Sequence, residues 1–258
     1  MRIPVYHVDA FTGRLFGGNP AAVCSLADWL PDATLQSIAA ENNLSETAFF
    51  VSTGDRCSLR WFTPMREVEL CGHATLAAAH VILNVLDPGR NAVAFDTASG
   101  ELTVGRANGL LSMDFPSHPP RPFDPPTDLI ESLGGDPLEV LEGQYPLVVY
   151  ESEMEVRFLA PDMKRLALAG GTAIVTAPGE EVDFVSRFFA PGYGIPEDPV
   201  TGSAHCTLIP FWAQRKSKYC FLARQVSARG GELHCEDRGE RVSIAGQAVL
   251  YMEGSIHL

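Results

Sequence analysis

Two stretches of the chain are apolar on almost every side. Residues 74–85 read ATLAAAHVILNV and follow Gly72, and residues 204–214 read AHCTLIPFWAQ and follow Gly202. A helix on a protein surface shows one apolar face, whereas a helix without a polar face must be enclosed on all sides. The pattern therefore predicts two buried helices, each wrapped by other elements of its own half of the chain.

The segments around these helices follow the same order in both halves. Each half has alternating apolar residues, a short helix opened by Pro-Asp (PDATLQSIAAENN in the first half), a β-branched and aromatic strand, and a strand of the form RxFxP. Asp32 is a candidate N-cap of the first short helix. We expect an α+β protein of two pseudo-symmetric domains, each a curled mixed β-sheet or barrel around a central α-helix.

This common order reflects an internal repeat with an offset of 125 to 131 residues. The clearest matched pairs are LPD (30–32) with APD (160–162), ETAFFV (46–51) with GTAIVT (171–176), RWFTP (60–64) with RFFAP (187–191), CGHA (71–74) with TGSA (201–204), and GEL (100–102) with GEL (231–233). Matches in one order at nearly constant offset indicate a duplicated domain, because each copy is far longer than a solenoid repeat.

A proline-rich segment separates the two copies. Residues 116–126, PSHPPRPFDPP, contain six prolines in eleven positions, which neither a helix nor a central strand accommodates. We predict an N-terminal domain over residues 1–117 and a C-terminal domain over residues 118–258, with the last residues able to pack back on the first domain.

Composition narrows the class of partner. The 258 residues are 46% hydrophobic, carry a net charge of −13 with a pI near 4.9, and contain no Lys/Arg cluster, which argues against nucleic acid and against a basic membrane-binding face. No apolar run approaches the roughly eighteen residues of a membrane span, and the N-terminus has no signal pattern. We expect a cytoplasmic protein whose partner is a small anionic metabolite.

The cysteines indicate neither disulfides nor a metal site. All six are scattered without C-x-x-C spacing in a chain too large to need disulfide support. The neighbouring His205 and Cys206, taken with Cys71 and His73, do not have the spacing of zinc ligands. We therefore predict free thiols and no metal.

The glycine at the start of each apolar helix points to an anion site. A helix N-terminus offers free N–H groups and the positive end of the helix dipole, and glycine lets a ligand approach the backbone. A pseudo-dyad would bring Gly72 and Gly202 near each other at the domain interface, where clefts form. Both glycines can also be tight turns only, but their matched positions favour a binding site for a carboxylate.

Positions where the two copies differ locate candidate chemistry. Glu46 is opposed by Gly171, so there is one candidate acid/base; the alternative is a solvated strand end. His73, opposed by Ser203, can hydrogen-bond a substrate oxygen or pass a proton, or simply bond to the backbone. Asp198 precedes the second helix and can bind a substrate hydroxyl or amine, or cap the turn.

Two further residues lie in the stretch CGHATLAAAH. Cys71 at a helix N-terminus is expected to have a lowered thiol pKa, which leaves a nucleophilic role open. Thr201 stands at the matching position, so a symmetric relay of two thiols is excluded. His80 lies two turns into the apolar helix and is interpreted as a hydrogen-bonded core histidine.

FGGNPAAV (16–23), SETAFF (45–50), ELCGHATLAAAH (69–80) and EDPVTGSAH (197–205) together resemble the PhzF-like phenazine-biosynthesis isomerase family. The resemblance runs from the first strand to the last. It implies a diaminopimelate epimerase-like fold with the active site between two similar domains, a homodimer, and catalysis without a metal or organic cofactor.

The resemblance also implies roles for individual residues. Glu46 would remove a proton from one carbon of a cyclic dienol acid and return one at another carbon, giving a ketone. His73, Asp198 and Ser203 would orient the substrate. The related epimerases have cysteines at both positions that match Cys71 and Thr201, so the single cysteine here argues against epimerisation.

Two alternatives remain open at this stage. One is an amino-acid epimerase or racemase in which Cys71 works with a partner that is not a thiol. The other is a catalytically silent metabolite-binding or scaffold protein that keeps the fold.

Overall fold

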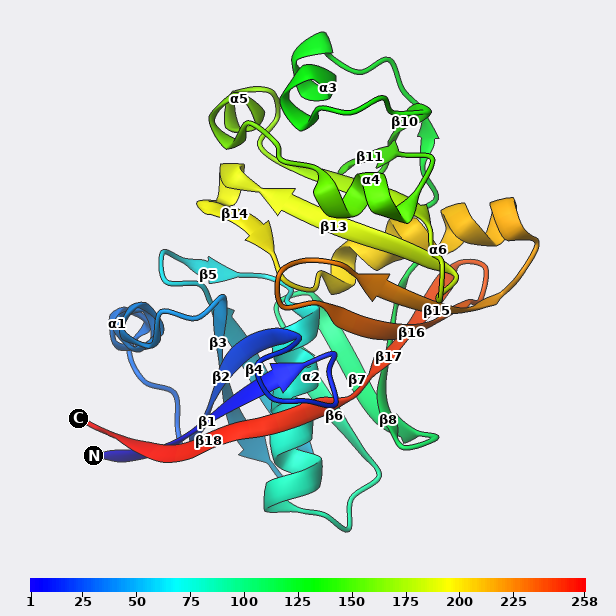
Figure 1. The fold of residues 1–258 in the computed structure, drawn as a ribbon. Coiled ribbons are helices and arrows are strands. Elements are labelled where there is room, and N and C mark those ends of the chain that lie inside the picture. The colour runs from blue at the N-terminus through cyan, green and yellow to red at the C-terminus, as the bar shows by residue number, and fades with distance from the viewer. The chain divides into compact units, whose positions relative to one another are not determined.

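The chain folds into two compact units, each a mixed β-sheet curled around a helix. The computed structural model describes residues 1–258. The first unit comprises residues 1–114 and 245–258, and the second comprises residues 115–244. None of the helices is long and apolar enough to cross a membrane. The predicted α+β class, with a mixed sheet around a helix in each copy, is confirmed (Figure 1).

In the first unit, strands surround one central helix. Its elements are β1 (Arg2–Ala10), β2 (Asn19–Leu26), α1 (Asp32–Asn42), β3 (Glu46–Thr53), β4 (Arg56–Phe62), β5 (Glu67–Val68), α2 (Gly72–His80), the π-helical segment η1 (Val81–Leu86), β6 (Ala92–Thr97), β7 (Gly100–Ala107), β8 (Leu110–Pro116) and β18 (Ala248–His257).

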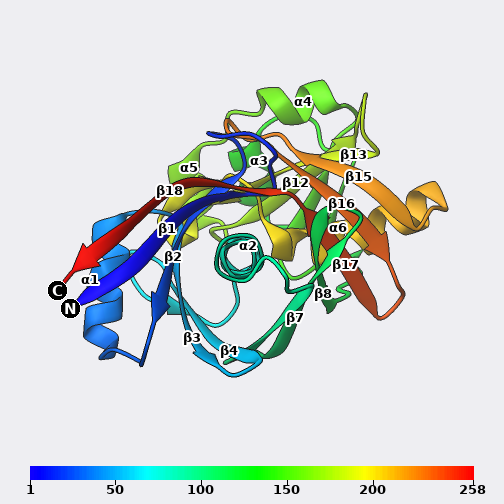
Figure 2. The same ribbon diagram turned by 90° about the horizontal axis from the view of Figure 1, so that it is seen from below.

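The pairing of these strands closes them around α2. They pair in the order β18, β1, β2, β3, β4, β6, β7, β8, and all pairs are antiparallel except β2 with β3 and β4 with β6. Figure 2 looks along α2 and shows β1, β2, β3, β4 and β7 around it. Every residue from His73 to Ala79 is buried, which confirms the enclosed helix that the apolar pattern predicted.

β2 and β3 bring two polar residues to the same edge of the sheet. Alternate residues of a strand face opposite sides, and Cys24 and Phe49 pack in the apolar cluster against α1. Asn19 and Glu46 therefore face the other side, toward α2. The two strands are parallel, with Ala21 opposite Glu46, so both polar residues lie where their strands begin.

The second unit has more helices. Its elements are β9 (Arg121–Pro122), α3 (Thr127–Leu133), β10 (Glu139–Glu142), β11 (Pro146–Val149), α4 (Glu153–Phe158), α5 (Met163–Leu168), β12 (Ala173–Pro178), β13 (Phe184–Ala190), the 3₁₀ turn η2 (Pro191–Tyr193), β14 (Ile195–Asp198), α6 (Gly202–Lys216), β15 (Cys220–Gln225), β16 (Gly231–Asp237) and β17 (Arg241–Gly246).

Helices cover both faces of β12 and β13. On one face, Leu129 of α3, Val156 of α4 and Leu166 of α5 join the apolar core. On the other face, the ring of Trp212 in α6 stacks on Phe184, with centroids 5.7 Å apart. A sheet buried on both faces explains why these strands are apolar without alternation.

Two ion pairs occupy matching positions in the two copies of the internal repeat. Arg60 of β4 binds Glu67 of β5, with Nε 2.7 Å from Oε1. Arg187 of β13 binds Glu197 of β14 through two hydrogen bonds of 2.8 and 2.9 Å. Each guanidinium also lies over the aromatic ring two residues further along its strand. The RxFxP pattern therefore has the same structural use in both copies.

Asp32 does not cap α1, contrary to the sequence-based prediction. The N-cap is Pro31, no side chain caps this end, and Asp32 is the first helical residue. Its carboxylate pairs instead with Arg60 at 2.9 Å. The six cysteines are free, and only Cys220 is exposed, so the prediction of free thiols is confirmed.

Candidate active site

Glu46, Cys71 and His73 form one cluster at the start of α2. Oε2 of Glu46 lies 3.0 Å from Nε2 of His73. Sγ of Cys71 lies 3.5 Å from Nδ1 and 4.0 Å from Nε2 of the same ring. Cys71 is the N-cap of α2 and His73 its second residue, so the helix start presents both side chains to the carboxylate.

The cluster is nearly closed to solvent within its unit. The side chain of His73 is 6% exposed and that of Glu46 is 18% exposed. Oε2 of Glu46 accepts no hydrogen bond apart from its contact with His73. Glu46 is thus a mostly buried strand end, and the partner of its Oε2 is another buried side chain.

The neighbouring groups determine the protonation of His73. Burial by itself lowers the pKa of the ring, but the sulfur of Cys71 and the carboxylate of Glu46 outweigh burial and raise the pKa of His73 well above 6.5. A proton is therefore held between the ring and the carboxylate at neutral pH. A carboxylate with a bound proton carrier beside it can act in acid/base chemistry.

Asn19 supports the ring of His73 from the opposite side. Its Nδ2 lies 3.2 Å from Nδ1 of His73. The preceding Gly18 has a φ of +62°, and a Cβ there would lie 2.1 Å from the carbonyl oxygen of Ala10. Glycine is needed for the turn that brings Asn19 to the start of β2. Sequence reasoning did not identify Asn19, although a polar residue opening an otherwise apolar strand was a usable signal.

The thiol pKa of Cys71 is raised, not lowered as the sequence predicted. Burial, followed by the negative charge of Glu46, raises the pKa of Cys71 to about 11. These effects outweigh the helix start, which favours the thiolate. Cys71 is therefore a neutral thiol at physiological pH, and it lacks the charge that a cysteine nucleophile or base requires.

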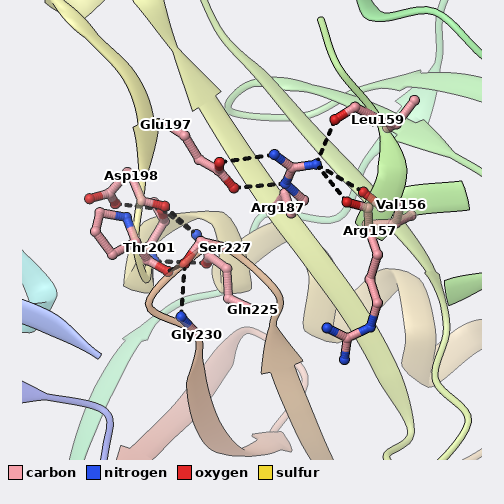
Figure 3. A network of polar contacts seen from close by, with 11 residues as sticks. Val156, Arg157, Leu159, Arg187, Glu197, Asp198, Thr201, Gln225, Ser227 and Gly230 are labelled. Atoms are coloured by element: carbon pink, nitrogen blue, oxygen red, sulfur yellow. Dashed lines mark hydrogen bonds and ion pairs between the residues drawn. The ribbon is translucent and has the colours of Figure 1, made fainter. Parts of the chain in front are cut away.

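The predicted residues of the second unit lie at the start of α6. Gly202 is the first residue of this helix, and Ser203 follows it, half-buried. Oδ2 of Asp198 accepts the Thr201 hydroxyl at 2.5 Å. Gln225 joins both ends of this turn, donating to the Asp198 carbonyl at 2.7 Å and accepting from the Thr201 N–H at 2.8 Å (Figure 3). The carboxylate of Asp198 therefore stabilises the turn into α6.

Tyr145 is a further polar residue near α6 that sequence reasoning missed. Its hydroxyl hydrogen-bonds with Ser203 and Tyr193, and its ring packs edge-on against Phe188, with centroids 4.8 Å apart. Burial, the largest effect, raises the pKa of Tyr145, so its hydroxyl keeps its proton. A lone tyrosine in the loop before β11 belongs to no periodic pattern, so nothing in the sequence marked it.

The strand registers show which residue of the second copy takes the place of Glu46. Phe49 pairs with Arg60, and Val175 pairs with the matching Arg187. Three residues before these positions lie Glu46 and Thr172, so the counterpart of Glu46 is the buried Thr172 and not Gly171, as the sequence alignment predicted. A hydroxyl is no carboxylic acid, so the repeat still contains one candidate acid/base.

His80 differs from the core histidine that the sequence predicted. Its ring is hydrogen-bonded, with Nδ1 2.9 Å from Nδ2 of Asn84, but it is only half-buried. It lines a cavity of about 240 Å³ together with Arg106 and the turn between β7 and β8. Burial and then the charge of Arg106 lower the pKa of His80, so the ring is neutral near pH 7.

Known proteins are similar to this chain over nearly its whole length. The family model described as "Phenazine biosynthesis-like protein" matches residues 8–254. An uncharacterized isomerase of Pseudomonas aeruginosa is 51% identical over 259 residues, which cover 100% of each chain.

Solved structures show the same fold. A crystal structure of a PhzF-family phenazine biosynthesis protein from Enterococcus faecalis is similar with a TM-score of 0.97 and 45% identity, covering 100% of both chains. A hydroxyproline epimerase from Agrobacterium vitis has a TM-score of 0.63 at 10% identity, covering 99% of this chain and 91% of that one. The latter likeness concerns the fold alone.

Proposed function

Because this chain belongs to the phenazine biosynthesis-like protein family, we propose that it is a cofactor-independent isomerase that moves a proton between carbons of a small cyclic carboxylic acid. Glu46 is its general acid/base. The observation that carries the proposal is the 3.0 Å contact between Oε2 of Glu46 and Nε2 of the buried His73. The name of the Pseudomonas relative supports the reaction class.

The reaction begins when the substrate takes the place of Glu46 beside His73. A substrate carboxylate is attracted by the free N–H groups at the start of α2 and by the protonated ring. Once His73 bonds to the substrate, Oε2 of Glu46 loses its partner and is free to accept a proton from the substrate.

Glu46 then carries the proton between carbons. Its carboxylate removes a proton from one carbon, the double bond shifts, and the carboxylic acid so formed donates a proton to a second carbon. No net redox change occurs. The charge of the cluster is restored when the product leaves and His73 pairs again with Glu46.

We propose that Gly72 in the first unit and Asp198, Gly202 and Ser203 in the second are substrate-binding residues. The support is the repeat, which gives each central helix a glycine as its first residue. Ser203 replaces His73 in the second copy and offers a hydroxyl that is already hydrogen-bonded to Tyr145. It can bind a neutral oxygen but cannot hold the charge of a second acid/base.

The test is exchange of carbon-bound hydrogen with deuterated water. Cyclohexadiene carboxylic acids that carry a hydroxyl or amino group are incubated with the protein, and deuterium incorporation is followed by NMR. The wild type exchanges, and Glu46→Gln, which is nearly isosteric, loses at least about 100-fold. Glu41→Gln, on the exposed side of α1, keeps the wild-type rate.

Two results would contradict this function. Equal exchange in Glu46→Gln would remove Glu46 from the chemistry. Acids that raise the melting temperature of the wild type without any exchange would favour a silent metabolite-binding protein.

We further propose that the protein acts as a cytoplasmic homodimer. The proposal rests on the resemblance to the PhzF-like family, which implies a homodimer. Sedimentation equilibrium of the purified protein should give the mass of two chains, and the mass of one chain would contradict the proposal.

A further inference from the structure

β18 stands at one end of the strand order in the first unit. It pairs with β1 along its whole length, and the other side of β1 is taken by β2, so β18 forms the edge of this sheet. Figure 1 shows β18 beside β1, with the two ends of the chain together. Residues 251–254, in the middle of β18, are all exposed. The outer N–H and C=O groups of an edge strand can pair with another strand.

The composition of β18 does not protect this edge. Proteins usually block an exposed edge with lysine, proline or charged side chains. The ten residues AVLYMEGSIH contain no lysine and no proline, and Glu253 is their one acidic residue, in a chain with a net charge of −13. A bulge interrupts the pairing of β18 with β1 between His7 and Val8. Residues 252–257 follow it as a regular stretch that is open to a partner strand.

Exposed apolar side chains lie at both ends of residues 252–257. At one end Phe16, which is 70% exposed, packs edge-on against Tyr251, with ring centroids 5.7 Å apart. A φ of +68° is unfavourable for an aromatic residue, yet Phe16 keeps it and donates its N–H to Oδ2 of Asp9 at 2.9 Å. At the other end, Met1 and Leu258 are both exposed. Each end therefore carries apolar surface that a partner can cover.

We propose that β18 pairs antiparallel with β18 of a second copy of this chain, about a two-fold axis at Gly254. The inference deepens the proposed homodimer and rests on it. Residues equally far before and after Gly254 then lie opposite one another, so Met252 faces Ile256 of the second copy. The aromatic pair at one end of the stretch comes to lie beside Leu258 of the second copy. The same patch serves both chains, as a two-fold interface requires.

Charge selects this position of the axis. Arg2 reaches across from β1 and donates from Nε to Oγ of Ser255 at 2.8 Å. With the axis at Gly254, Ser255 lies opposite Glu253 of the second copy, whose carboxylate is then within reach of the Arg2 guanidinium. An axis one residue earlier would oppose the two Glu253 side chains, and an axis one residue later would bring the two Arg2 side chains together. Like charges directly opposite each other are destabilising.

Reversal of these charges tests the pairing. Sedimentation equilibrium of the wild type should give the mass of two chains. Glu253→Arg sets two cations against each other and should weaken the dimer by at least about 100-fold, and Arg2→Glu should do the same with two anions. The double variant Arg2→Glu/Glu253→Arg restores opposite charges and should dimerise again. Glu41→Arg makes the same change of charge on the exposed side of α1 and is the control.

A cross-link tests the position of the axis. Paired residues of antiparallel strands have Cα atoms roughly 4.5–5.5 Å apart, a separation that a disulfide spans. A Cβ at Gly254 would meet only Cγ1 of Val5, at 3.9 Å, so Gly254→Cys fits. In a Cys220→Ser background, which removes the exposed thiol, oxidised Gly254→Cys should run as two linked chains on a non-reducing gel. Ser99→Cys, in the exposed turn between β6 and β7, should run as one chain.

The results separate the interface from the homodimer. The edge pairing is overturned, and the homodimer stands, if a two-chain wild type keeps its mass in Glu253→Arg and Arg2→Glu or gives no cross-link in Gly254→Cys. The same holds if the double variant is folded by circular dichroism but stays a single chain. A wild type with the mass of one chain would contradict both the interface and the homodimer.

Discussion

Oε2 of Glu46 lies 3.0 Å from Nε2 of His73, although the two residues belong to different elements. β3 carries the carboxylate and α2 carries the imidazole. The contact makes each group the main charged partner of the other in a site that is nearly closed to water. The chemistry available to Glu46 therefore depends on what His73 contacts.

The first prediction concerns the pKa of His73. In Glu46→Gln the ring loses a negative partner while its burial remains, and burial lowers the pKa of an imidazole. We expect the pKa of His73 to fall, because only the sulfur of Cys71 then opposes the effect of burial. NMR titration of the ring C–H signals measures the change, with Glu41→Gln as the control. An unchanged pKa of His73 would show that the two side chains are not paired in solution.

The second prediction concerns Cys71. A thiol with a pKa of about 11 is less than about 1% thiolate at pH 8, so iodoacetamide should label the exposed Cys220 long before Cys71. Cys71→Ala should reduce hydrogen exchange by less than about tenfold, because proton transfer by Glu46 does not need the sulfur. Mass spectrometry locates the label. Rapid labelling of Cys71 with loss of activity, absent in Cys71→Ala, would instead support the epimerase alternative.

The third prediction compares the two arginines of the repeat. Arg187 is 13% exposed and donates to the carbonyls of Val156, Arg157 and Leu159 as well as to Glu197 (Figure 3). Lysine cannot reproduce this fork of donors, so Arg187→Lys should lower the free energy of unfolding by about 3 kcal/mol.

Arg60→Lys is the matched control for this prediction. Arg60 is 26% exposed, and its partners are more exposed still, so the same substitution should lower the free energy of unfolding by about 1 kcal/mol or less. For a chain of this size each kcal/mol shifts the melting temperature by about 2–4 °C. Equal shifts of the melting temperature in Arg187→Lys and Arg60→Lys would show that the hydrogen bonds of Arg187 to the three carbonyls do not add to stability.

The fourth prediction concerns stability in acid. His205 is fully buried in α6, its Nδ1 bonds to the Thr201 carbonyl at 2.8 Å, and its Nε2 has no partner. Burial outweighs that hydrogen bond and lowers the pKa of His205 from 6.5 to about 4. Between these values the unfolded chain binds the proton and the folded chain does not. The free energy of unfolding should therefore fall as pH drops through this window, by up to about 3 kcal/mol.

His205→Gln removes the titrating group and should flatten this pH dependence. His257→Gln changes an exposed ring and should leave the dependence as in the wild type. Urea unfolding across the pH window measures both. The same slope in all three proteins would show that His205 is not the source of the acid sensitivity.

Local patterns predicted those features that depend on neighbours along the chain. The apolar run after Gly72 predicted the enclosed α2, and the repeat carried that prediction to Gly202 and α6. The N-cap assigned to Asp32 was wrong because Pro31, one residue earlier, takes that place. Boundaries of this kind depend on single backbone conformations, which sequence patterns determine only to within one or two residues.

The sequence by itself determined the fold class, the duplicated order of elements and the one glutamate without a counterpart. Periodicity and repetition are properties of the chain, so they can be recognised before it folds. Only the tertiary structure decided that Glu46 meets His73, that Asn19 supports the ring, and that Cys71 stays a thiol. Those properties arise from distance and desolvation between segments far apart in sequence, and both exist only once β2, β3 and α2 are packed together.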